Sequence, residues 1–210
     1  MPEGFLAVST CPSTRLPLKE FHEWYDQEHI PNRLDRFKEF LSGARYKAVQ
    51  PQPHSESGSW LALYTVDSPA IFASAAYNDL RINRSARETD VMTRIQLLTR
   101  RTGQIIGTLR DQEKTTGFRP GQPSGWVITH GIDIRPVDKK DAAKEVMSWA
   151  GYIEGEAAKY GVIEEGWART LVVLVLESGV SYFGKNVDGD DDQIKMPFFV
   201  VHGKQFSLNH

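Results

Sequence analysis

The most informative stretch of this chain is residues 21–33, which read FHEWYDQEHIPNR. Aromatic and apolar residues recur in it at helical spacing, and Pro31 interrupts the helix two residues after His29. A solvated helix face does not need an acid, an imidazole and two aromatic rings beside a proline. We therefore predict a helix that ends near His29 and holds this imidazole at the mouth of a cavity.

Around this stretch, strand and helix patterns follow one another in a definite order. The expected segments are a strand at 4–11, a helix at 18–29 with a further turn or two through Leu34, Phe37 and Phe40, strands at 43–49 and 59–66, a helix that Asp67, Ser68 and Pro69 start and that runs over 70–80, a helix at 85–98, and a strand at 104–109. This β-α-β-β-α-β order is that of the ferredoxin-like arrangement.

The second half of the chain starts the pattern again after a Gly/Pro-rich segment at 115–124. Strands are expected at 126–134, 166–177 and 197–206, and a helix at 138–160. A weak internal repeat supports this division. Trp24 is followed by Gly43-Ala44-Arg45, and Trp149 is followed at nearly the same distance by Gly166-Trp167-Ala168-Arg169. We therefore predict an α+β fold of tandem ferredoxin-like repeats, with a first domain at 1–114, a linker at 115–124 and a partial second repeat at 125–210.

Composition and charge limit the classes of function. The chain has 210 residues, of which 40% are hydrophobic, and its formal net charge of −2 provides no field that would attract nucleic acid or an anionic membrane. The apolar run at 5–8 is too short for a signal peptide, and Cys11 is the sole cysteine, which excludes an internal disulfide and a thiolate zinc site. We expect a cytoplasmic protein without nucleic-acid or membrane partners.

Specific residues in the first half resemble a known family. The segments are Trp24-Tyr25, Glu28-His29-Ile30-Pro31 with Arg33, Gly43-Ala44-Arg45-Tyr46 and 77–88, YNDLRINRSARE. They resemble the EthD-like branch of the dimeric α/β-barrel proteins. The resemblance implies that two ferredoxin-like units pack as a barrel-type pseudo-dimer, and a homodimer is possible. The second repeat keeps an aromatic and an acid between Trp149 and Glu156 but lacks the histidine, which implies one working site in each chain.

Three residues are candidates for catalysis. His29 can act as a general acid or base, with its protonation tuned by Glu28 or by an aromatic roof, or it can cap the helix end. Tyr25, one turn earlier on the same face, can donate its phenol to a developing enolate or can simply pack on the sheet. His130 lies in a strand pattern and can reach a barrel interior or belong to the core. We expect His22 to be a surface group.

Candidate substrate-binding residues surround these. Trp24 and Trp60 are expected to line an apolar cavity, with Glu28 beside them. Asn83 and Arg84, with neighbouring arginines, form a cationic cluster that can recognise a carboxylate or phenolate, or brace the helix junction through Asp79, Glu88 or Asp90. The acidic loop at 186–192 lacks the full calcium-loop spacing, so we expect no metal site.

The sequence favours a small cofactor-independent enzyme of secondary metabolism, a lyase, cyclase or isomerase. Its expected reaction is cyclisation, dehydration, decarboxylation or isomerisation of an aromatic, polyketide-like or lactone metabolite by proton transfer at His29. Two alternatives are a non-catalytic ligand-binding or stress protein on the same fold and a haem-dependent oxygenase. The sequence contains no G-x-S-x-G, Walker, G-x-G-x-x-G or H-E-x-x-H motif.

Overall fold

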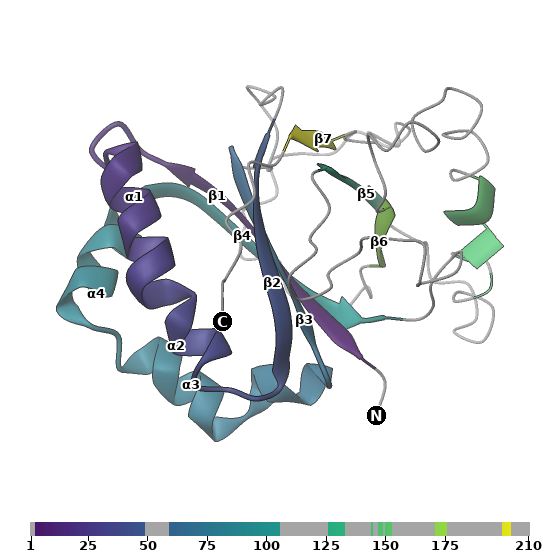
Figure 1. The fold of residues 1–210 in the computed structure, drawn as a ribbon, viewed down its shortest axis with the longest axis horizontal. Coiled ribbons are helices and arrows are strands. Elements are labelled where there is room, and N and C mark those ends of the chain that lie inside the picture. Colours follow the sequence, from purple (N-terminus) through teal and green to yellow (C-terminus); the bar gives the residue numbers. More distant parts are fainter. Residues whose placement is uncertain are drawn as a thin grey trace, which may run out of the picture.

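A computed structural model describes residues 3–48, 59–105, 126–132, 171–175 and 199–202, together with helical residues at 144, 147, 148 and 150–152. Figure 1 shows helices packed against one face of a twisted sheet in the first half of the chain. The predicted linker at 115–124 and the acidic loop at 186–192 lie outside the described residues. No helix in the described ranges has the length and apolar character needed to cross a membrane.

The first half has the predicted order of elements. They are β1 (Gly4–Pro12), α1 (Leu18–Trp24), the π-helix η1 (Tyr25–His29), α2 (Pro31–Leu34), β2 (Phe40–Ala48), β3 (Trp60–Val66), the 3₁₀ helix η2 (Pro69–Ala73), α3 (Ala75–Ile82), α4 (Ala86–Thr93) and β4 (Ile95–Gln104). The strands form an antiparallel sheet in the order β4-β1-β3-β2. The α+β class is therefore confirmed.

The sheet continues from β2 into the second half of the chain. Strand β7 (Phe199–His202) pairs antiparallel with β2 and with β5 (Trp126–Ile132), and β5 pairs in parallel with β6 (Leu171–Val175). In the first half, by contrast, β1 and β2 lie on either side of β3. Strands do occur inside the predicted segments 126–134, 166–177 and 197–206, but the tandem repeat and the barrel remain predictions.

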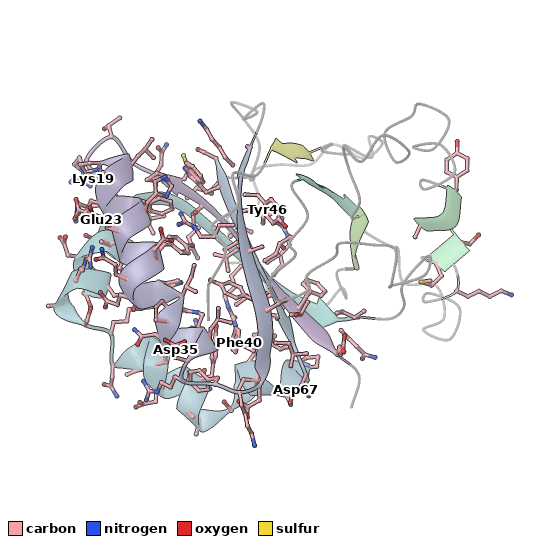
Figure 2. The ribbon with its side chains drawn as sticks, viewed as in Figure 1. Lys19, Glu23, Asp35, Phe40, Tyr46 and Asp67 are labelled. Atoms are coloured by element: carbon pink, nitrogen blue, oxygen red, sulfur yellow. The ribbon has the colours of Figure 1, made fainter. Side chains whose placement is uncertain are left out.

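Strand alternation divides the core of the first half between the two faces of the sheet. Toward the helices, side chains such as Leu6, Val8, Tyr64 and Val66 pack with Phe21, Trp24, Tyr25 and Tyr77. On the other face, Phe5, Ala7, Ala44, Tyr46, Leu61 and Leu63 form a second buried cluster. Figure 2 shows Phe40 beside the helices and Tyr46 on the far side of β2. Both faces of the central strands are thus covered, and polar groups among them need partners.

Four predicted boundaries are wrong for identifiable reasons. The helix expected at 85–98 ends at Thr93, because Ile95 to Gln104 pair with β1 and tertiary pairing overrides helical propensity. For the same reason the last strand of the first half is β4 at Ile95–Gln104, which shares only Gln104 with the strand expected at 104–109. The turn after Pro31 extends to Phe37, whose N–H donates to the Arg33 carbonyl at 3.0 Å, but Phe40 already begins β2. The segment after Ser68 splits into η2 and α3, each started by a serine side chain that accepts a backbone N–H.

Candidate functional site

A π-helical turn places His29 among aromatic rings. The N–H of Ile30 donates to the carbonyl of Tyr25, five residues earlier, at 2.9 Å. This wider turn brings both Trp24 and Tyr25 against the imidazole, with ring centroids 4.4 Å and 4.9 Å from that of His29. Such turns inside helices are frequent at functional sites, because they displace side chains from regular helical positions.

The imidazole of His29 is bound to a buried carboxylate. Its Nδ1 lies 3.0 Å from Oε1 of Glu88, and the two residues are 7% and 4% exposed. Glu88 lies in the first turn of α4, where its N–H donates to Oγ of Ser85, the N-cap residue, at 2.9 Å. The acid beside His29 is thus Glu88, whereas the sequence had suggested Glu28. The predicted aromatic roof is present.

Burial decides the protonation of this pair. Loss of solvent lowers the pKa of His29 to about 4, and the Arg33 charge acts in the same direction, while Glu88 opposes both. Burial by itself raises the pKa of Glu88, but its hydrogen bond to His29 and nearby positive charges outweigh burial, so this pKa is lowered. At neutral pH a neutral imidazole therefore donates Nδ1–H to the Glu88 carboxylate. Its Nε2 then carries the free lone pair.

Arg45, which is buried, lies beside Tyr25. Its guanidinium is centred 4.1 Å from the Tyr25 ring, donates from Nη1 to Oδ1 of Asp26 at 2.8 Å, and donates from Nη2 to Nδ1 of His22 at 2.9 Å. His22 is half-buried against Trp60, with ring centroids 4.5 Å apart, so the expectation of a surface group is wrong. Burial and the Arg45 charge lower the pKa of His22. Arg45 thus ties the strand β2 to two turns of the helix above it.

Tyr25 keeps its proton in this environment. Burial raises the pKa of its phenol, against the opposing influence of the Arg45 and Arg33 charges. A neutral phenol next to a neutral imidazole can donate a hydrogen bond to a developing anion. The predicted pairing of Tyr25 with His29 in space is therefore present, and its catalytic role remains a prediction.

The other predicted site residues lie at different depths. Trp24 is fully buried at the His29 ring, whereas Glu28 is half-buried and accepts a hydrogen bond from the Ser85 hydroxyl. Asn83 and Arg84 are exposed, and the Asn83 amide donates to Asp79 at 2.6 Å. His130 belongs to β5, where its backbone pairs with that of Val173 in β6.

Three buried charged groups of the site were not among the predicted site residues. Glu88 had a local signal, since Ser85 and Glu88 have the spacing of a capping box, but that spacing does not point to a histidine 59 residues earlier. Arg33 and Arg45 stood inside the motifs that carried the family resemblance. Nothing in their local pattern indicates burial, because arginine is rarely buried.

Comparisons with family models, curated proteins and solved structures found no match to this chain. The resemblance to the EthD-like family remains a prediction. Within the part of the chain that the structure describes, no three histidine, cysteine or acidic side chains lie together in a way that could hold a metal ion.

Proposed function

We propose that this protein is an enzyme that transfers protons through the His29–Glu88 pair, on an aromatic, polyketide-like or lactone metabolite and without a cofactor. The observation that supports this most directly is the 3.0 Å contact between His29 Nδ1 and Glu88 in a buried setting. A carboxylate at Nδ1 orients an imidazole, fixes its tautomer and stabilises the imidazolium that forms when Nε2 takes a proton.

The proposed step is the removal of a proton from an activated carbon. Nε2 of His29 takes the proton, the electron pair of the C–H bond moves onto the adjacent carbonyl to form an enolate, and the imidazolium then returns the proton to another atom. The phenol of Tyr25 can donate a hydrogen bond to the enolate oxygen. Because burial holds the pKa of His29 at about 4, His29 is a weak base, suited to acidic C–H groups between two carbonyls. Polyketide-like compounds contain such groups.

The two alternative functions, a non-catalytic ligand-binding protein and a haem protein, would use His29 differently. A non-catalytic ligand-binding protein would use the same contacts only to brace α4 against η1. A haem protein would need an open face at its axial histidine. The rings of Trp24 and Tyr25, with centroids within 5 Å of that of His29, occupy the space beside the imidazole that the plane of a haem needs, so these residues do not fit a haem.

Proton exchange of a model compound tests the proposal without the natural substrate. The loss of the central C–H signal of an aromatic β-diketone in D₂O is followed by NMR with the wild type, His29→Gln and His22→Gln. His22→Gln is the matched control, since His22 lies in α1, directly before the π-helical turn, and its ring packs on Trp60. We expect the wild type and His22→Gln to accelerate exchange above buffer, and His29→Gln to lose the acceleration. Full acceleration by His29→Gln, or none by the wild type, would contradict the proposal, and a Soret band in the purified protein would favour haem.

A further inference from the structure

Arg33 is a buried cation without an ion-pair partner among the described residues. Its side chain is 7% exposed, and its hydrogen bond runs from Nη1 to the backbone carbonyl of His29 at 2.6 Å. Glu88 lies close enough to be affected by this charge, but its carboxylate contacts His29. Burying a guanidinium without a counter-ion is costly, and proteins normally pair such a group.

A second unsatisfied group lies under the same helix. The hydroxyl of Tyr64 is buried and has no hydrogen-bond partner among the described residues, and Tyr64 is 2% exposed. A Cβ at Gly43 would lie 2.9 Å from the Tyr64 ring and 3.6 Å from Leu34, the neighbour of Arg33 in α2. Tyr64 therefore lies beneath α2. Tyr25 and Tyr64 belong to one buried cluster, against which Leu34 packs, and Arg33 reaches the carbonyl of His29, so these groups lie in one region.

We propose that Arg33 and the Tyr64 hydroxyl form the binding subsite for an anionic oxygen of the substrate, a carboxylate or phenolate, next to His29. An anionic oxygen fits this site better than a neutral one, because a charge-assisted hydrogen bond to a buried guanidinium is stronger than a neutral one. This inference rests on the proposed function and narrows its substrate class to organic anions. It also places anion recognition at Arg33, away from the exposed Asn83 and Arg84.

A bound anion has a second consequence for the imidazole. The charge of Arg33 is one of the causes that hold the pKa of His29 low, so an anion at Arg33 raises that pKa and makes His29 a stronger base when the subsite is filled. Binding of the substrate would then strengthen the base that acts on it.

Binding of benzoate to the full chain tests the subsite, with neutral benzamide as the comparison and calorimetry as the readout. Tyr64→Phe removes an unpartnered hydroxyl, so the fold should survive. Tyr46→Phe is the matched control: the Tyr46 hydroxyl is equally buried and unpartnered but lies on the opposite face of the sheet. We expect benzoate to bind more tightly than benzamide, and Tyr64→Phe and Arg33→Gln to weaken benzoate binding roughly tenfold or more. Tyr46→Phe should match the wild type.

Each remaining outcome has a definite meaning. No binding of benzoate to the wild type, equal binding of benzamide, wild-type affinity in Tyr64→Phe, or equal losses in the two phenylalanine variants would each overturn the subsite. Binding to His29→Gln separates the two proposals. If His29→Gln binds benzoate with wild-type affinity and also still accelerates proton exchange of the β-diketone, the proposed function fails and the anion subsite stands.

Discussion

Acidification should destabilise the fold through His29. In the unfolded chain this imidazole has its ordinary pKa of 6.5, whereas in the folded protein burial holds the pKa at about 4. Between these values the unfolded state binds the additional proton, so the free energy of unfolding falls as the pH falls through this window. At about 1.4 kcal/mol per pH unit, the difference corresponds to about 3 kcal/mol. The contribution is complete above pH 6.5 and is lost at about pH 4.

Urea denaturation of the wild type and His29→Gln at several pH values between 7 and 4 measures this effect. Glutamine does not titrate, so the free energy of unfolding of the variant should fall by about 3 kcal/mol less over the same range. His22→Gln is the comparison: its imidazole also has a lowered pKa but is only half-buried, so its removal should change the pH dependence less. Parallel curves for the wild type and His29→Gln would show that the pKa of His29 is not lowered in the folded protein.

Three further substitutions probe the supports of the site. Gly43→Ala should destabilise by about 1–3 kcal/mol, because its Cβ would lie 2.9 Å from the Tyr64 ring; a urea midpoint equal to that of the wild type would show that the ring can move. Asp26→Asn removes the carboxylate that accepts a hydrogen bond from the buried Arg45 and should cost roughly 2 kcal/mol, measured by urea unfolding; an unchanged urea midpoint would show that other groups or solvent replace the carboxylate. Ser85→Ala removes the N-cap of α4 and should lower the free energy of unfolding by about 1 kcal/mol. Because Glu88 then loses its anchor, proton exchange of the β-diketone should also slow; unchanged thermal unfolding and unchanged proton exchange would argue against both effects.

The local features of the first half could be predicted from its sequence. Alternating apolar residues and serine caps have local causes, so the order of strands and helices was correct over the first half. The boundary near Ile95 was missed because the sequence pattern of residues 95–98 is helical, whereas in the structure these residues pair with β1. Propensity describes a residue in its own segment, while strand pairing depends on a partner far away in the chain.

The site was only partly predictable for the same reason. His29, Tyr25 and Trp24 share one stretch of chain, and their clustering was visible in the spacing. The π-helical turn that brings Trp24 onto the imidazole has no reliable sequence signal. The carboxylate at Nδ1 comes from Glu88, 59 residues later, and its role follows from packing of α4 against η1. The part of the site that the sequence did not predict is therefore the part that depends on contacts between polar groups far apart in the chain.

The proposed proton transfer depends on the protonation state of His29 at neutral pH, which can be measured directly. A two-bond ¹H–¹⁵N NMR correlation spectrum of the wild type at pH 7, assigned with His29→Gln, reports which ring nitrogen carries the proton. We expect a neutral imidazole with its proton on Nδ1, facing Glu88, and an unprotonated Nε2. An imidazolium, or a neutral ring with its proton on Nε2, would contradict it.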